Sequence, residues 1–365
     1  MDISLNVLNR QFQLYQEEYE EAAIRVLRSG WYILGPELEA FEGEFARYVG
    51  SKYCVGVNSG LDALVLAVKA LGIGEGDEVI VPANTYIATV LAVTANGAMP
   101  IPVEPDEYYN MDSEKLASAI TERTKAILAV HLYGQSADMD SIRSVAEQYG
   151  LHLLEDCAQS HGARYHEAMT GTFGEVGCFS FYPTKNLGAF GDAGAVVTDS
   201  EGLYQQLCML RNYGSRVKYH NKIEGVNSRL DELQAALLRV KLSHLDELIA
   251  ERRKIASQYL RGIGNPLLRL PVTRKGAEHV YHQFVVRTRG RDYFQEYLNH
   301  NGISTVIHYP IPPHLAECYH RLGYQKGDFP ITERYAGEVL SLPMFNGMRQ
   351  EEIEYVIQVC NNYVV

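Results

Sequence analysis

Paired cysteines, long apolar runs and an excess of basic residues are all missing from this sequence. Its six cysteines form no CxxC pair, a pattern that favours reduced thiols over disulfides or a zinc site, so we expect no bound metal. No window approaches the roughly 18 uncharged apolar residues of a membrane-spanning helix, so none is expected. The first residues are polar and acidic, unlike a signal peptide, and a cytoplasmic protein is therefore expected.

The charge and the length of the chain further narrow the class of protein. The 33 Lys and Arg residues are outnumbered by 45 Asp and Glu residues, which gives a net charge of −12. Because a phosphate backbone attracts dense positive charge, we expect no nucleic-acid partner. At 365 residues the chain exceeds the length at which a single core stops growing, so we expect one large domain and a smaller one.

Short apolar runs alternate with helical stretches along most of the chain. Helical spacing appears over residues 15–29, 36–48 and 139–149, and the second stretch has a proline in its first turn, where helices tolerate it. Short strands separated by amphipathic helices are typical of a mostly parallel sheet with helices on both faces. The expected strands are YCVGV, DEVIVPA, MPIPV, KAILAVHL, LHLLED, GCFSF and GAVVTD.

A long segment rich in helix-forming residues follows this alternation. Residues near 229–263 contain no proline, so the sequence predicts one long helix that joins two domains. Beyond it, the segments HQFVVRT, DYFQEYLNHNG, STVIHYP and EEIEYVIQVCNNY indicate a small α/β unit. We therefore expect a large domain over residues 1–245, with the N-terminal helices, and a small C-terminal domain over residues 246–365.

Three loops at the expected carboxyl ends of strands carry residues suited to chemistry, because ligands bind at that edge of an open α/β sheet. Ser59 and Gly60 stand between a strand and a helix, where the free amides of Gly60 and Leu61 suit a phosphate. Asp156 ends a strand, and Lys185 lies 29 residues further on in a polar turn between apolar strands. Taken singly, each has a simpler interpretation: a helix cap, a capping carboxylate and a solvated lysine.

The ordered combination of these three parts matches the needs of pyridoxal 5′-phosphate (PLP). Asp156 would pair with the pyridinium nitrogen and make the ring an electron sink, while Lys185 would hold the aldehyde as an imine. A desolvated lysine with charged neighbours loses its proton more readily, which favours attack on a carbonyl. The sequence therefore predicts a PLP enzyme.

Six segments give the chain a family resemblance: NSGLDAL, PANTYIAT, EDCAQSHGA, GCFSFYPTKNLGAFGDAGA, NSRLDELQAALLRVKL and IHYPIPPH. Together they resemble the sugar aminotransferases of the DegT/StrS type, and the likeness covers nearly the whole chain. The resemblance implies the aspartate aminotransferase fold (fold type I), in which an α/β large domain with a mostly parallel sheet carries a smaller C-terminal α/β domain. It also implies a homodimer with shared active sites.

The resemblance further implies roles for individual residues. Lys185 and Asp156 are the catalytic residues. At Leu61 the family commonly has a polar residue, so only the backbone of Leu61 is expected to act. The residues implied to bind the cofactor are Gly60, Leu61 and Ser180 at the phosphate, Tyr86 and Ala158 on the two ring faces, Gln159 at the ring hydroxyl, and Asn227 from the neighbouring subunit.

The expected substrates are glutamate, as amino donor, and a nucleotide-linked keto-sugar, in a two-stage scheme with Lys185 as the proton shuttle. The basic stretch RNYGSRVKYHNK is either a solvated loop or the contact for a nucleotide diphosphate, with Tyr219 near the sugar. His308 and Tyr309 resemble the pair found in members that act on 3-keto sugars. With Tyr182, they favour amination at C3 of a dTDP-linked 3-keto-6-deoxyhexose.

Other functions remain compatible with parts of the sequence. VIHYP has a simpler interpretation as a strand of the small domain whose aromatic residue packs inward. Amination at C4 of a nucleotide-linked 4-keto-6-deoxy sugar is the alternative function. The non-enzyme alternative is a regulatory protein that retains the fold, although no expected cofactor residue is missing. Relatives that dehydrate carry His in place of Lys185, and cysteine desulfurases need a reactive loop cysteine, for which Cys318 is the only candidate, so both are disfavoured.

Overall fold

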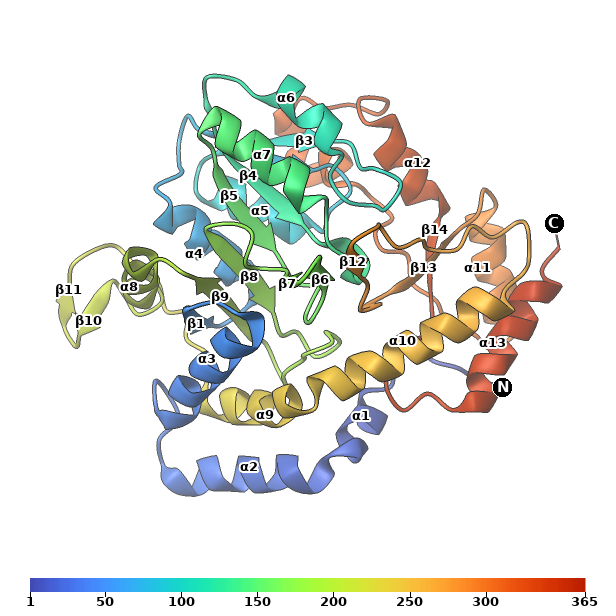
Figure 1. The fold of residues 1–365 in the computed structure, drawn as a ribbon, viewed down its shortest axis with the longest axis horizontal. Helices are drawn as coiled ribbons and strands as arrows, with labels where there is room; N and C mark the ends of the chain where they lie inside the picture. Colours follow the sequence, from blue (N-terminus) through green and yellow to red (C-terminus); the bar gives the residue numbers. More distant parts are fainter. Residues whose placement is uncertain (365) are drawn as a thin grey trace.

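A seven-stranded sheet forms the centre of the structure, a computed structural model that describes residues 1–364 (Figure 1). Its strands are β1 (Tyr53–Val57), β2 (Glu78–Pro82), β3 (Met99–Val103), β4 (Thr124–Val130), β5 (His152–Asp156), β8 (Val176–Ser180) and β9 (Gly194–Thr198). They lie in the order β1-β9-β8-β5-β4-β2-β3. β9 runs opposite to the other six strands of this sheet, and the pairs that do not involve it are parallel, which confirms the mostly parallel sheet.

Helices cover both faces of this sheet, as the alternation of strands and helices predicts. The helices of this part of the chain are α1 (Leu8–Leu14), α2 (Gln16–Ser29), α3 (Pro36–Val49), α4 (Gly60–Ala70), α5 (Ile87–Ala95), α6 (Leu116–Ala119), α7 (Met139–Tyr149), α8 (Glu201–Leu210) and α9 (Glu232–Ser243), with short 3-10 turns η1 (Ser113–Lys115) and η2 (Leu132–Gly134). Expected helices 36–48 and 139–149 therefore match α3 and α7, whereas the one expected over 15–29 begins after a break at Tyr15.

Successive side chains of a strand enter different cores because they point to opposite faces of the sheet. Val55 and Val57 pack with α4, α5 and α8 on one face. Cys54 packs with α3 and α9 on the other face, and Ile80 and Ile127 pack with α7 beside them. The two buried faces fix the strand register, and with it the residues that reach the carboxyl edge.

The C-terminal part has its own core. It is built from α10 (Leu245–Gly262), α11 (Arg291–His300), α12 (Pro330–Glu338), α13 (Gln350–Asn362), the antiparallel pair β13 (Phe284–Arg287) and β14 (Val339–Leu342), and the turns η3 (Pro313–Leu315) and η4 (Glu317–Leu322). Tyr259, Phe284, Phe294 and Phe345 are buried together in this core. Ile3 joins them and bridges Ile303, so the first residues of the chain pack with this part.

Two details of the C-terminal part differ from the sequence expectation. The single long helix expected near 229–263 is two helices, α9 and α10, because the backbone at His244 (φ −108°, ψ 6°) leaves the helical region. The segment STVIHYP is not a regular strand: Val306 alone bridges Ser341, and the prolines that follow have no N–H for a ladder.

Two small sheets complete the described chain. One contains β6 (Arg164–Tyr165), β7 (Ala168–Met169) and β12 (Ala277–Glu278), and the other is the hairpin of β10 (Ser215–Val217) and β11 (His220–Asn221). The hairpin projects from the body beside α8 (Figure 1). No helix within residues 1–364 has both the length and the apolar composition that crossing a membrane requires.

Candidate active site

The structure brings the three predicted loops together at the carboxyl edge of the sheet. Asp156 is the last residue of β5, Ser180 is the last residue of the neighbouring β8, and Gly60 opens α4. A Cβ atom at Gly60 would lie 2.4 Å from Cβ of Ser180, so only glycine permits this approach. The amino end of α4 and Ser180 therefore form one surface, with amide groups that suit an anion.

Asp156 is a buried carboxylate with few partners. Its Oδ1 accepts a hydrogen bond from the backbone N–H of Ala158 at 3.1 Å, and its Oδ2 accepts one from the hydroxyl of Thr89 at 2.8 Å. Burial raises the pKa of Asp156, although the two hydrogen bonds and the nearby positive charge of Lys185 oppose the rise. A buried charge that is only partly compensated favours a cationic partner.

Lys185 follows β8 in a turn that its own backbone N–H closes on the carbonyl of Tyr182 at 2.8 Å. Burial lowers the pKa of Lys185 to about 8, and the Asp156 carboxylate opposes this change. At pH 7 about a tenth of the amine is therefore unprotonated, far more than for an ordinary lysine, and this is the form that attacks a carbonyl.

The adjacent Gln159 is fixed at both ends of its amide. Its Oε1 accepts from the backbone N–H of Tyr133 at 2.7 Å, and its Nε2 donates to the hydroxyl of Tyr309 at 2.9 Å. The ring of Tyr86 lies 5.0 Å from that of Tyr309 and is 52% exposed. One face of the Tyr86 ring is therefore accessible, as it must be if Tyr86 is to stack on the ring of a cofactor.

His308 and Tyr182 also lie around Lys185. Nδ1 of His308 is 2.8 Å from the hydroxyl of Ser341. Burial and the charge of Lys185 lower the pKa of His308 to about 4, so its imidazole is neutral near pH 7. Tyr182 is 53% exposed, and its backbone N–H lies 3.4 Å from the hydroxyl of Ser180.

Three other predicted residues are placed differently. Tyr219 lies on the projecting hairpin, is 84% exposed, and has the ammonium of Lys218 5.1 Å from its ring centre. Asn227 is exposed on the strand-like segment that bridges Asn212. The side chain of Leu61, in the first turn of α4, is partly buried and packs against the hydrophobic core on that face of the sheet.

The sequence interpretation missed Thr89 and Tyr133. Thr89 is fully buried, and it was visible as a polar residue within the apolar helix IATVLAVTA. Tyr133 acts through its backbone N–H and an unusual positive φ of 60°, and no pattern in the sequence marks it. Glu155, beside Asp156, is structural: it accepts hydrogen bonds from the backbone of Gly171 and from two residues beyond it.

Residues 13–361 match the DegT/DnrJ/EryC1/StrS aminotransferase family. The chain belongs to that family. It is 54% identical over 350 residues to an Aneurinibacillus thermoaerophilus protein named dTDP-3-amino-3,6-dideoxy-alpha-D-galactopyranose transaminase, with 96% of each chain covered. It is 52% identical over 339 residues to a Streptomyces venezuelae dTDP-3-amino-3,4,6-trideoxy-alpha-D-glucose transaminase, with 92% of this chain and 89% of the relative covered.

The fold of the family is also that of this chain. The crystal structure of S. venezuelae DesV in complex with a ketimine intermediate superposes with a TM-score of 0.98, at 48% identity and with 100% of both chains covered. The predicted family, the aminotransferase fold and the aminotransferase activity are therefore confirmed.

Proposed function

We propose that this chain is a PLP-dependent aminotransferase that moves an amino group from glutamate to C3 of a dTDP-linked 3-keto-6-deoxyhexose. The observation that carries the proposal is the buried Asp156 carboxylate beside Lys185, whose pKa is lowered to about 8. The names of the two relatives, both dTDP-3-amino sugar transaminases, support the C3 assignment over C4.

The residues at the carboxyl edge fit PLP. The raised pKa of Asp156 indicates a buried carboxylate that lacks full compensation, and a protonated pyridine nitrogen would supply it. The close approach of Gly60 to Ser180 leaves an amide-lined surface for the phosphate. Both features belong to this chain's own geometry and are independent of the family match.

Each predicted cofactor residue then has a role. Lys185 would hold the cofactor covalently and Asp156 would pair with its ring nitrogen. One N–H of the Gln159 amide is used by Tyr309, so the second can donate to the ring hydroxyl. The remaining residues divide into Gly60, Leu61 and Ser180 at the phosphate and Tyr86 and Ala158 on the ring faces.

When bound, PLP would carry the amino group and withdraw electrons from the carbon that loses or gains a proton. Lys185 Nζ would take that proton from the donor's carbon and return it to the sugar carbon in the second half-reaction. Asp156 would remain ionised throughout and hold the positive charge of the ring nitrogen. The neutral imidazole of His308 is suited to a hydrogen bond with a sugar hydroxyl.

The sugar would lie between the Lys185 turn and the segment that carries His308 and Tyr309. Tyr309 is fixed by Gln159, and Tyr182, in the Lys185 turn, is open to solvent. If these three side chains converge on the hydroxyl next to the reacting carbonyl, C3 lies over the cofactor, and a misplacement of about 1 Å would cost roughly a hundredfold in rate.

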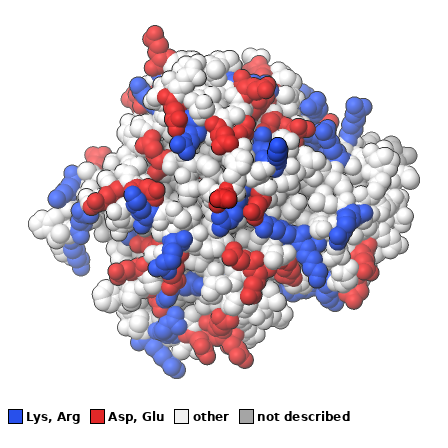
Figure 2. All heavy atoms as spheres, in the orientation of Figure 1, with Lys and Arg blue, Asp and Glu red and all other residues white. Residues whose placement is uncertain are grey.

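We also propose a homodimer with shared active sites. Leu27, Trp31 and Tyr32 are each more than half exposed on and after α2, and such apolar surface favours a partner. The hairpin tip carries exposed basic residues, and Lys and Arg side chains are visible there in Figure 2, whereas charges of both signs mix over the rest of that face. Tyr219 and Asn227 would thus reach the neighbouring subunit's site.

A mixing experiment tests the shared site. Lys185→Ala subunits, inactive alone, and Asn227→Ala subunits, weakly active alone, should regain activity when they are unfolded and refolded together. The mixed dimer has one site with an intact Lys185 and an intact partner Asn227. No recovery in a mixture that forms mixed dimers would place Asn227 in its own subunit's site.

The domain boundary is a further proposal. We place it near residue 245, between α9 and α10, because the core of Tyr259, Phe284 and Phe294 lies beyond that point. The packing of Ile3 on this core adds the first residues of the chain to the small domain.

The reaction itself is tested by the visible absorption of the protein loaded with PLP. Glutamate should bleach the band and release 2-oxoglutarate, and the keto-sugar should restore it. In Lys185→Ala the fold should persist while turnover is lost, because the amine is both tether and proton shuttle. A protein that takes up no PLP, or a Lys185→Ala variant that turns over without an added amine, would refute the proposal.

A further inference from the structure

The segment after β4, residues 131–136, joins the two parts of the chain beside the candidate active site. Tyr133 and Gly134 both have positive φ, at 60° and 111°, which turns their peptide groups toward the C-terminal part. The carbonyl of Tyr133 accepts from the backbone N–H of Gln283 at 3.2 Å. A Cβ on Gly134 would lie 2.7 Å from the backbone nitrogen of His282, so this contact requires glycine.

Tyr133 closes a ring of hydrogen bonds with three residues of the site. Its backbone N–H donates to Oε1 of Gln159 at 2.7 Å, and Nε2 of Gln159 donates to the hydroxyl of Tyr309 at 2.9 Å. The hydroxyl of Tyr133 donates to the carbonyl of His308, the residue before Tyr309. Tyr133 is only 5% exposed, so water does not compete for these bonds.

This ring of hydrogen bonds fixes the direction in which the Gln159 amide and the Tyr309 hydroxyl point. Because a backbone N–H occupies Oε1 of Gln159, the amide cannot flip without leaving that N–H unpaired, so its second N–H keeps one direction. The hydroxyl of Tyr309 accepts from Gln159, and its own proton is therefore available to a ligand. A single residue, Tyr133, thus orients groups on two different segments.

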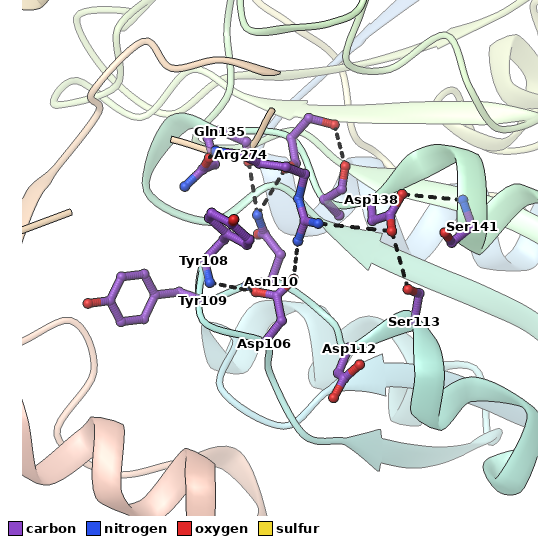
Figure 3. A network of polar contacts seen from close by, with 12 residues as sticks. Asp106, Tyr108, Tyr109, Asn110, Asp112, Ser113, Gln135, Asp138, Ser141 and Arg274 are labelled. Carbon is purple, nitrogen blue, oxygen red and sulfur yellow. Dashed lines mark hydrogen bonds and ion pairs between the residues drawn. The ribbon is translucent and has the colours of Figure 1, made fainter. Parts of the chain in front are cut away.

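A second polar network, around Asn110 and Arg274, also holds residues 131–136 (Figure 3). Oδ1 of Asn110 accepts from the backbone N–H of Leu132 at 2.9 Å, and its Nδ2 donates to the carbonyl of Gln135 at 3.3 Å. The side chain of Gln135 accepts from the backbone N–H of Arg274 at 2.9 Å, and the guanidinium of Arg274 pairs with Asp106. Hydrogen bonds therefore hold the chain both before Tyr133, at Leu132, and after it, at Gln135, which fixes the position of the Tyr133 backbone.

We propose that Tyr133 is a positioning residue for the sugar half-reaction: its hydroxyl holds the His308 carbonyl and thereby aims the Tyr309 hydroxyl at the keto-sugar. The inference rests on the proposed function. It assigns no contact between Tyr133 and substrate. The glutamate half-reaction depends on Lys185 and Asp156, which the Tyr133 hydroxyl does not touch.

The test compares Tyr133→Phe with a matched control, Tyr109→Phe. Tyr109 is equally buried, and its ring packs on that of Tyr133 at 5.3 Å, so the control removes a hydroxyl from the same cluster without touching His308. In Tyr133→Phe, kcat/KM for the dTDP-linked 3-keto sugar should fall roughly tenfold, the effect of one buried hydrogen bond. The single-turnover rate with glutamate should stay within about twofold in both variants.

Hydrogen–deuterium exchange of the cofactor-free protein gives a readout that is independent of activity. Peptides covering residues 305–310 should exchange faster in Tyr133→Phe than in the unaltered protein or in Tyr109→Phe. Unchanged exchange in this segment, or an equal loss of rate in both half-reactions, would overturn the role given to Tyr133 but leave the proposed function in place. An unaltered protein that loads PLP but does not react with glutamate would overturn the proposed function and, with it, the role assigned to Tyr133.

Discussion

Replacing Thr89 by Val removes one of the two hydrogen bonds on Asp156 and the acceptor of the buried Thr85 hydroxyl. The hydroxyl of Thr89 has a single proton, which it donates to Oδ2 of Asp156 at 2.8 Å. The hydroxyl of Thr85, 2.7 Å away, must therefore be the donor to Thr89. Valine has nearly the volume of threonine, so the change leaves no large cavity at this fully buried position. It removes the donor to Asp156 and leaves the Thr85 hydroxyl without its acceptor, a cost that the Thr85→Val control also measures.

The expected cost follows from the charge on Asp156. A hydrogen bond to a charged group contributes about 1.5–3 kcal/mol. Without it the pKa of the buried carboxylate rises further, and Asp156 competes with the ring nitrogen for the proton that sustains electron withdrawal. At about 1.4 kcal/mol per factor of ten, the glutamate half-reaction should slow roughly ten- to hundredfold.

Single-turnover bleaching of the visible band by glutamate measures this effect. Thr85→Val is the control: it removes the donor to Thr89 but leaves the bond between Thr89 and Asp156, so its effect should be smaller. A Thr89→Val protein that loads PLP and reacts within twofold of the normal rate would refute the role given to this bond.

Further predictions concern the carboxylate, the sugar contact and pH. Asp156→Asn should still bind PLP but transaminate at least roughly a hundredfold more slowly; near-normal rates would assign the ring nitrogen to another acid. His308→Ala should slow the sugar half-reaction more than the glutamate half-reaction, and equal losses would argue against a sugar contact. Burial lowers the pKa of His161 and His279 to about 3, so their stabilisation is complete above pH 6.5 and is lost as pH falls. At pH 5 each neutral imidazole should reduce stability by about 2 kcal/mol relative to pH 7. The Tm of the cofactor-free protein should show this loss, and a Tm that is flat from pH 7 to 5 would contradict it.

Much of the fold could be predicted from the sequence because local signals agree there. Gly30, Gly50 and Gly150 end three helices in the left-handed conformation, and Ser59 caps α4 through the N–H of Asp62. Parallel strands that are buried on both faces appear as short apolar runs. The order of these signals along the chain also predicted Asp156 and Lys185 at one edge of the sheet.

The parts that could not be predicted depend on contacts between distant segments. The break at His244 lies in a segment without proline or glycine, so no composition signal marks it. The prolines that follow VIHYP do disfavour a regular strand, and the expectation of a strand there gave them too little weight. Tyr133 meets Gln159 and His308 through a backbone N–H and a hydroxyl, across separations of 26 and 175 residues. Periodicity describes single elements, so such pairings are visible only in three dimensions.

The position of the transferred nitrogen tests the central claim most directly. The PLP-loaded protein would be incubated with 15N-glutamate and a dTDP-linked 3-keto-6-deoxyhexose, and the sugar product examined by NMR for coupling between 15N and each ring carbon. We predict 15N at C3 in the unaltered protein and no labelled sugar with Lys185→Ala. Label at C4 after incubation with a 4-keto-6-deoxy sugar, or bleaching by glutamate with no transfer to the 3-keto sugar, would contradict the account.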